Sequence, residues 1–308
     1  MNALPRLYVV LGPTASGKSA LGIALARRVG GEILVCDSTQ VYRHFDIGTG
    51  KVPRAEQQGI EHHLMDIVAP DAVFTAGEYR RRALEALEDL RSRGRVPVIT
   101  AGTGLYLRAL LEGLADSPER SEDLRERMRA IVALRGPARL HAILKRLDPE
   151  SAARIEPADT QKVIRAVELR LLAGKPVGDI HRSGREPLQG YEIVKIGLAP
   201  PRPALYARIH QRIDAMIAAG WIDEVRHLID SGVPETAKPF QFIGYSQWRE
   251  FLHQKLSRED AIEQIRKATR HFAKRQQTWF RRELGVHWIE GFGDDPATIR
   301  AAERFIGA

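Results

Sequence analysis

The sequence has 308 residues, of which 44% are hydrophobic and 28% are charged, with a net charge of +8. No apolar run approaches the roughly 18 residues of a membrane span, and the five-residue apolar run before Gly12 is too short for a secretory signal, so no membrane partner is expected. The single cysteine, Cys36, excludes an intrachain disulfide and a cysteine-based zinc site, which favours a cytoplasmic location.

The first motif along the chain fills every fixed position of the phosphate-binding P-loop pattern, with the residues Gly12, Pro13, Thr14, Ala15, Ser16, Gly17, Lys18 and Ser19. Residues 7–11 before it predict a buried strand, and residues 19–29 after it predict a helix. In that context main-chain N–H groups surround phosphate oxygens, Lys18 adds a charge, and Ser19 is the candidate ligand of a phosphate-bound Mg²⁺. The motif leaves open whether the diphosphate belongs to a nucleotide or to another substrate.

Two further predicted strands deliver polar residues to the same rim as the P-loop. Residues 32–36 end at Asp37, and residues 96–100 lead to Thr103 between two glycines. The carboxyl ends of parallel strands line one ligand crevice, so both are candidate catalytic residues. Asp37 has two alternative roles, as a Walker-B-like Mg²⁺ ligand or as a turn cap. Thr103 suits close approach to a diphosphate oxygen, and its alternative role is a helix N-cap.

The remaining pattern predicts an α/β protein with a P-loop, nucleotide-kinase-like parallel sheet and an inserted all-helical domain. Residues 61–68 predict a third strand, in which adjacent His62 and His63 point to opposite faces and cannot share one metal ion. The core is expected at residues 1–115 and 190–308, and the insertion at 116–189. Further elements are predicted as helices at 75–90, 123–134, 138–147, 160–173, 205–228 and 257–282, and as strands at 192–198 and 286–289.

Most of the excess positive charge lies in the last long helix. Seven basic residues and no acidic residue lie between Arg266 and Arg282. On a helical wheel, Arg266, Lys267, Arg270, Lys274 and Arg281 form one stripe, and Ile265, Ala268, Phe272 and Trp279 form the opposite one. We therefore expect a helix that packs by its apolar stripe and offers the cationic stripe to nucleic-acid phosphates.

Several motifs together resemble those of bacterial tRNA dimethylallyltransferases (tRNA isopentenyltransferases), which prenylate the adenosine immediately 3′ of the anticodon. Besides the P-loop, the matching segments are residues 37–42, 46–49, 102–106, 163–166, 243–245 and 273–280, so the resemblance covers nearly the whole chain. The chain departs from the family pattern at Thr39, Ala101, Gln241, Phe242 and Ser246. The resemblance implies dimethylallyl diphosphate and tRNA as substrates, Mg²⁺ as cofactor, and a helical domain that helps to grip the anticodon arm.

The resemblance also implies roles for individual residues. Asp37 is the general base that takes the proton from the adenine amine, Thr103 orients the diphosphate or the amine, and the P-loop binds the diphosphate. The implied tRNA contacts are Asp37, Ser38, Thr39, Gln40, Thr103, Arg125, Gln161, Lys162, Val163, Ile164, Arg165, Gln241, Phe242, Ile243, Gly244, Tyr245, Ser246, Arg270, Lys274, Arg275, Gln276, Gln277, Thr278, Trp279, Phe280 and Arg281.

Three other functions use the same P-loop. A small-metabolite kinase would use Asp37 for its acceptor hydroxyl or for Mg²⁺, a nucleic-acid-binding regulator would sense a nucleotide, and a related prenyltransferase would modify free AMP. The kinase alternative leaves the basic helix and the long insertion unexplained. A monomer is the default expectation for the oligomeric state.

Overall fold

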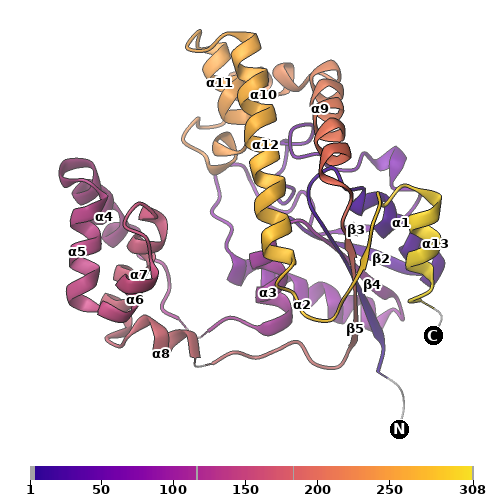
Figure 1. Cartoon of the computed structure of the whole chain (residues 1–308), viewed down its shortest axis with the longest axis horizontal. Helices are drawn as coiled ribbons and strands as arrows, with labels where there is room; N and C mark the ends of the chain where they lie inside the picture. The colour runs from indigo at the N-terminus through magenta and orange to yellow at the C-terminus, as the bar shows by residue number, and fades with distance from the viewer. Residues whose placement is uncertain (1–3, 116, 183, 307–308) are drawn as a thin grey trace. The chain divides into compact units, whose positions relative to one another are not determined.

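The computed structural model describes residues 4–115, 117–182 and 184–306 (Figure 1). The predicted first residue of the insertion, 116, lies outside the described residues. The chain divides into two compact units. We call Met1–Leu110 with Gln189–Ala308 the core unit, and Leu111–Leu188 the insertion unit.

The core unit is built on one parallel six-stranded sheet with the order β3-β2-β4-β1-β5-β6, which confirms the predicted α/β class. The strands are β1 (Arg6–Leu11), β2 (Gly31–Cys36), β3 (His62–His63), β4 (Val96–Ala101), β5 (Glu192–Leu198) and β6 (Val286–Ile289). Strands β1, β2 and β4 are buried almost throughout, as expected for the aliphatic central strands of a parallel sheet covered on both faces.

Helices cover the sheet, and two of them, α1 and α3, start just after the carboxyl ends of strands β1 and β4. Helix α1 (Lys18–Val29) packs with α13 (Pro296–Glu303) in one hydrophobic cluster with β1, β2 and β5. Helix α2 (Ala76–Ser92) packs against β2 and β4, and α3 (Gly104–Glu112) follows β4 directly (Figure 1). This arrangement places the loops after β1, β2 and β4 at one edge of the sheet.

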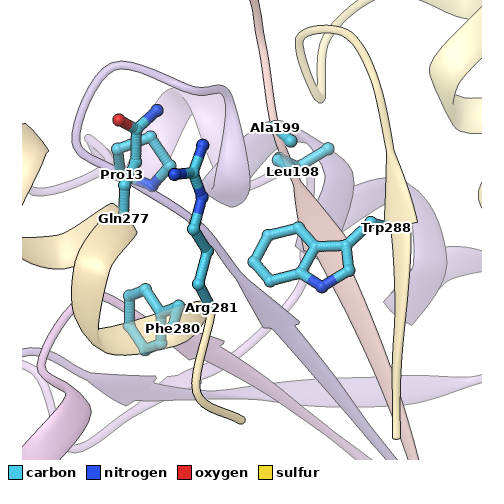
Figure 2. Close-up of a pocket in the computed structure, with 8 residues that line it drawn as sticks. Pro13, Leu198, Ala199, Gln277, Phe280, Arg281 and Trp288 are labelled. Atoms are coloured by element: carbon cyan, nitrogen blue, oxygen red, sulfur yellow. The ribbon is translucent and has the colours of Figure 1, made fainter. Parts of the chain in front are cut away.

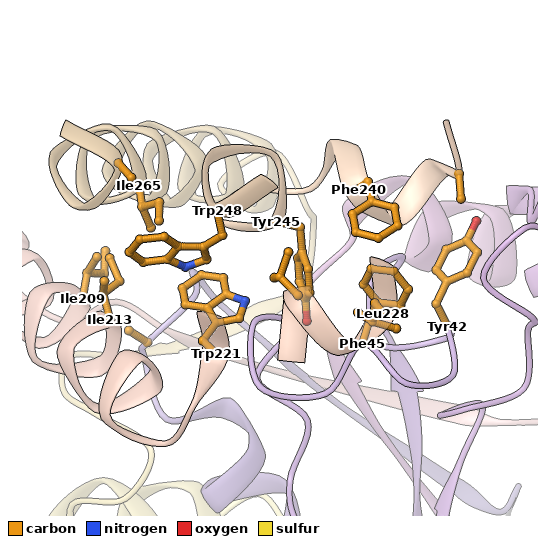
Figure 3. Packing of buried hydrophobic residues seen from close by; sticks show 14 of the residues in the cluster. Tyr42, Phe45, Ile209, Ile213, Trp221, Leu228, Phe240, Tyr245, Trp248 and Ile265 are labelled. Carbon is orange, nitrogen blue, oxygen red and sulfur yellow. The ribbon is translucent and has the colours of Figure 1, made fainter. Parts of the chain in front are cut away.

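The rest of the core unit is a helical module. It comprises α9 (Arg202–Ala218), α10 (Trp221–Asp230), the 3₁₀ helix η2 (Lys238–Gln241), α11 (Tyr245–Leu252) and α12 (Arg258–Phe280). Its centre is an aromatic cluster in which the rings of Trp221 and Trp248 lie 6.2 Å apart, and those of Phe45 and Tyr245 4.9 Å apart (Figure 3). The cluster joins these helices to the loop after β2, because Phe45 belongs to that loop.

Two predicted elements differ from the structure because of backbone conformation. The strand expected at 61–68 is only the two residues of β3, since Leu64 and Asp66 have φ of 66° and 58°, outside the strand region. Val68 retains a single bridge to Tyr42. The helix expected at 205–228 is divided into α9 and α10 by Gly220, which has a φ of 93°. A short 3₁₀ helix, η1 (Arg54–Glu56), precedes β3.

The insertion unit is helical. It contains α4 (Glu122–Arg135), α5 (Pro137–Leu147), α6 (Pro149–Arg154), α7 (Thr160–Ala173) and α8 (Val177–Arg182). Leu140 and Leu144 of α5 pack against Val163 and Val167 of α7 in its core. No helix in the described part of the chain is both long enough and apolar enough to span a membrane.

A buried carboxylate in this unit is paired with two arginines. The Glu168 carboxylate accepts hydrogen bonds from Arg125 (2.8 Å), Arg165 (2.6 Å) and the Ser121 N–H (2.9 Å). Burial alone would raise the pKa of Glu168, but these hydrogen bonds outweigh it and lower the pKa to about 2. The ion pairs therefore stabilise the unit fully above pH 4.5, and this contribution is lost as the pH falls toward 2.

We expect Glu168→Gln to lower the free energy of unfolding by about 3 kcal/mol, since it leaves two half-buried guanidinium groups without their counter-charge. Chemical denaturation measures the loss. The exposed Glu150 of α6, which pairs with Arg154, supplies the control, and Glu150→Gln should have little effect. Equal losses in the two variants would contradict the assignment.

Candidate active site

The loop between β1 and α1 has the conformation of a phosphate cradle. Ala15 and Gly17 have φ of 62° and 84°, which turns successive N–H groups inward. A Cβ at residue 17 would lie 2.6 Å from the Gly293 nitrogen, so only glycine fits there. The Gly293 N–H, in the segment after β6, donates a hydrogen bond to the Ser16 carbonyl (2.8 Å) and so stabilises the conformation of the P-loop.

Lys18 lies at the base of this cradle. Its Nζ donates to the Pro13 carbonyl at 2.7 Å. Burial lowers the pKa of Lys18 to about 8, while the negative charge of Asp37 opposes that shift and the positive charge of Arg212 adds to it. Arg212 of α9 also has a lowered pKa, caused by burial and opposed by Asp37. The site thus brings together two cations and one carboxylate.

Sequence reasoning missed Arg212, because nothing in a helix far along the chain connects it to the P-loop. Its side chain is half-buried, and its Nη2 donates to the Gly50 carbonyl at 3.3 Å. The only available signal is its position between Ile209 and Ile213, on the apolar side of α9. A charged residue among packing residues is unusual, since burying a charge costs free energy unless the charge is paired or binds a ligand.

The two candidate catalytic residues lie next to each other at the ends of β2 and β4. Asp37 Oδ1 accepts hydrogen bonds from the N–H (2.9 Å) and hydroxyl (2.7 Å) of Thr39. Thr103 Oγ1 accepts from the Ser38 N–H at 2.9 Å. A Cβ at Gly102 would lie 2.3 Å from Asp37 Oδ2, so a larger residue there would displace the carboxylate from its present position. The carboxylate is therefore held in a fixed orientation.

These contacts bear on the alternative roles of both residues. Thr103 occupies the N-cap position of α3, because its carbonyl accepts the N–H groups of Tyr106 and Leu107. Its hydroxyl nevertheless bonds to Ser38 and not to its own helix. Asp37 closes a turn through Oδ1, which leaves Oδ2 directed toward Gly102.

Helix α12 packs by a face that overlaps only in part with the predicted one, since Ile265 is buried as expected but other members of the apolar stripe are not. Its buried residues are Ala261, Ile265, Ala273, Gln276 and Phe280, whereas Phe272 is only half-buried and Trp279 is 38% exposed. The hydrophobic pattern is misleading here because the buried face includes a polar residue, Gln276. The Trp279 ring instead lies against Gly104, where a Cβ would come within 2.1 Å of it, and Arg108 stacks over that ring at 5.7 Å.

The predicted cationic stripe divides into paired and exposed members. Arg266 is 2.6 Å from Asp214, and Arg270 lies 2.7 Å from His210 and 3.5 Å from Glu263. The other members of the stripe are exposed, namely Lys267, Lys274 and Arg281, and so are Arg275 and Arg282 of the same basic segment.

Six of the implied tRNA contacts are buried in this structure, and their implied contact with tRNA stays a prediction. They are Val163, Ile164, Gly244, Tyr245, Gln276 and Phe280. The reason is packing, since each sits on the inner face of its helix or against an aromatic cluster. Tyr245, for example, donates its hydroxyl to Glu224 at 2.6 Å. Arg125 and Arg165 are half-buried and bound to Glu168.

The remaining implied contacts have at least partly accessible side chains. Ser38, Thr39 and Gln40 line the rim after β2, and Gln40 donates to the Thr49 carbonyl at 3.2 Å. The others in the core unit are Gln241, Phe242, Ile243, Ser246, Gln277 and Thr278, and those in the insertion unit are Gln161 and Lys162.

Oxygen donors at the P-loop fit a hard cation such as Mg²⁺. Ser19 begins the first turn of α1 after Lys18, and Asp37 offers a carboxylate close to Lys18. The Ser16 hydroxyl is buried and has no hydrogen-bond partner among the described residues. Phosphate oxygens would supply the other ligands, as is usual for this ion.

A second group of metal-binding side chains lies near the other end of β2. Glu32, Glu61 and His63 have ligand atoms within 4.8 Å of one another. Glu32, however, already accepts hydrogen bonds from Arg93 (2.7 Å), Arg95 (3.1 Å) and His63 (2.7 Å). The hydrogen bonds from Arg93 and His63 outweigh burial and lower the pKa of Glu32 to about 2. We therefore assign this group to an ion-pair network. His62 bonds instead to the Ile60 carbonyl.

A recess of about 190 Å³ lies beside the first residues of the P-loop (Figure 2). Its walls are mainly apolar and include Pro13, Leu198, Phe280 and Trp288, with Arg281 projecting between them. Because its strand residues belong to β5 and β6, it lies across β1 from Asp37.

A parallel sheet with a P-loop, a half-buried lysine and an adjacent carboxylate defines a P-loop α/β protein built to act on a phosphorylated substrate. The model of the IPP transferase family matches residues 40–283. The chain therefore belongs to the IPP transferase family.

Similar proteins extend this finding over the whole length. A tRNA dimethylallyltransferase from Koribacter versatilis is 50% identical over 302 residues, which is 98% of each chain. The crystal structure of the tRNA isopentenylpyrophosphate transferase from Bacillus halodurans is 36% identical with a TM-score of 0.72, covering 98% of this chain and 95% of its own. A eukaryotic dimethylallyltransferase acting on tRNA is 26% identical with a TM-score of 0.80, covering 98% and 78%.

Proposed function

We propose that this protein transfers a dimethylallyl group from dimethylallyl diphosphate to N6 of the adenosine 3′-adjacent to the anticodon in tRNA, and releases diphosphate. The observation that carries the proposal is the pairing of a phosphate cradle with a fixed carboxylate at one sheet edge, in a chain similar to tRNA dimethylallyltransferases over nearly its full length. In the reaction, a bond forms between N6 and C1 of the allyl group, the C1–O bond breaks, and N6 loses a proton.

The cations of the site would stabilise the departing diphosphate. The Thr14 N–H donates to Gln276 at 2.7 Å and the Ser16 N–H donates to the Pro13 carbonyl at 3.3 Å, so the other N–H groups from Ala15 to Ser19 form the cradle. Lys18 and Arg212 add two charges that are fixed before the substrate arrives. Preorganised donors of this kind are effective because no reorganisation is needed as charge develops. Mg²⁺, held by Ser19 and phosphate oxygens, would neutralise the same charge when bound.

Asp37 would act on the adenine amine. That nitrogen is a poor nucleophile because its lone pair is delocalised into the ring. A carboxylate oxygen directed at the amine accepts its hydrogen and then takes the proton as the C–N bond forms. Thr103, next to Asp37, would orient the amine or the diphosphate. The adenosine must leave the base stack, which costs least in a single-stranded loop such as the anticodon loop.

The exposed cations of α12 would hold tRNA phosphates, and the insertion unit would add contacts to the anticodon arm through Gln161 and Lys162. We expect Lys274→Ala to weaken tRNA binding and to flatten the slope of log affinity against log salt concentration by about 0.7 to 0.9. Alanine preserves the helix, so stability should change little. Affinity measured at several salt concentrations tests this.

Arg266→Ala is the matched control from the same helix. Its guanidinium is already paired with Asp214 at 2.6 Å, so its loss should alter the slope much less than the loss of Lys274. An unchanged slope in Lys274→Ala would mean that this stripe is only a solvated surface, and that tRNA binds elsewhere.

One assay separates the proposed function from its rivals. Purified protein is incubated with labelled dimethylallyl diphosphate and unmodified tRNA, beside reactions with free AMP and with ATP plus candidate acceptors. Label in tRNA supports the proposal. Label in AMP would favour prenylation of the free nucleotide, and phosphoryl transfer from ATP would favour a kinase. We also propose that the protein is cytoplasmic and monomeric. Sedimentation of the purified protein tests the oligomeric state.

A further inference from the structure

Gln276 is the one polar side chain in the buried face of α12, and it spans the two loops of the site. It is 6% exposed. Its Oε1 accepts a hydrogen bond from the Thr14 N–H of the P-loop at 2.7 Å. Its Nε2 donates to the carbonyl of Gly102, in the loop after β4, at 2.8 Å. The oxygen and the nitrogen of one side-chain amide thus bind two main-chain groups that are 88 residues apart in the sequence.

Each loop held by Gln276 carries one half of the proposed chemistry. The P-loop fixes the diphosphate and hence the electrophilic carbon. Gly102 touches the Asp37 carboxylate and precedes Thr103, and both its N–H and that of Thr103 donate to the Cys36 carbonyl at 3.0 Å. The distance between the two loops therefore sets the distance between the electrophilic carbon and the amine.

We propose that Gln276 is a positioning residue that sets the separation of the diphosphate loop and the Asp37–Thr103 loop for transfer. This inference rests on the proposed function. A glutamine suits the task because its amide has a donor and an acceptor at one end, where glutamate has only acceptors when ionised and methionine has neither strong group. An error of about 1 Å in such a separation slows a two-substrate reaction, since reacting atoms must meet in a narrow range of geometry.

The first test is Gln276→Met, which keeps the length and burial of the side chain. We expect kcat to fall about tenfold, with the KM for tRNA unchanged, because Gln276 is buried and its amide is occupied. Ile265→Val is the matched control from the same buried face of the same helix. It removes a buried methyl group, so it should lower Tm and leave kcat unchanged at a temperature where both variants are folded.

The second test is Gln276→Glu, which keeps the acceptor for Thr14 and loses the donor for Gly102 when ionised. Protonation restores a donor, so kcat relative to the unmodified protein should rise as the pH falls. The charged groups that face the two loops are Asp37, Lys18 and Arg212, with Asp294 and its partner Arg208 beside Gly17, and all of them are present in both proteins. Gln276→Met should give a ratio independent of pH.

The outcomes are distinct. Unchanged kcat in Gln276→Met, or a pH-independent ratio in Gln276→Glu, would overturn the positioning role. Failure of the unmodified protein to label tRNA would instead refute the proposed function itself.

Discussion

Asp37→Asn is expected to lower kcat by about 10²-fold or more while tRNA affinity stays within a few-fold. An asparagine oxygen can still accept the Thr39 N–H, so the turn after β2 should keep its shape. The amide cannot take the adenine proton, and raising the pH should not restore the rate. Single-turnover transfer of labelled dimethylallyl to tRNA, with tRNA binding measured separately, tests both parts.

Asp223→Asn supplies the control for Asp37. Asp223 is an exposed acid of α10 that pairs with Arg226, away from the loops of the site. It should retain full activity. Near-normal turnover of Asp37→Asn would end its assignment as the general base and leave it as the cap of a turn.

Lys18→Met is expected to lower kcat/KM for dimethylallyl diphosphate by about 10² to 10³, since it removes a preorganised charge from the cradle. Binding of tRNA in the absence of diphosphate should not change. Stability should stay the same or rise, because burial already disfavours the charge on Lys18, lowering its pKa to about 8.

Thermal unfolding and steady-state kinetics of Lys18→Met together check that argument. Lys255→Met, at an exposed position before α12, controls for loss of a lysine as such. A variant that lost tRNA affinity as strongly as diphosphate use would contradict the assignment of Lys18 to phosphate.

The local pattern of the sequence was sufficient for the regular elements of the core. An apolar run before a glycine-rich motif predicted β1, the P-loop and α1. Local residue types were sufficient there, because the strand, the turn and the helix are each favoured by residues adjacent in the sequence. β5 and β6 have the predicted bounds, 192–198 and 286–289. The joining of Asp37 and Thr103 at one edge also followed from sequence, since parallel strands place their carboxyl ends together.

The sequence patterns did not predict the backbone conformation of single residues. Leu64 and Asp66 adopt positive φ in a stretch with strand-like composition, so β3 is cut to two residues. Tertiary contacts impose this conformation, which local propensity does not encode. Gly220 likewise divided a pattern that reads as one helix.

The sequence by itself determined the P-loop, the carboxylate beside it, the α/β class and the charge of α12, because each depends on residue type and local spacing. Only the tertiary structure decided which side chains meet across long separations. It brought Arg212 to Lys18, buried Tyr245 and Phe280, paired Arg266 with Asp214, and placed Gln276 between Thr14 and Gly102. The physical reason is that burial and pairing depend on the neighbours supplied by distant elements, which a helical wheel or a motif does not contain.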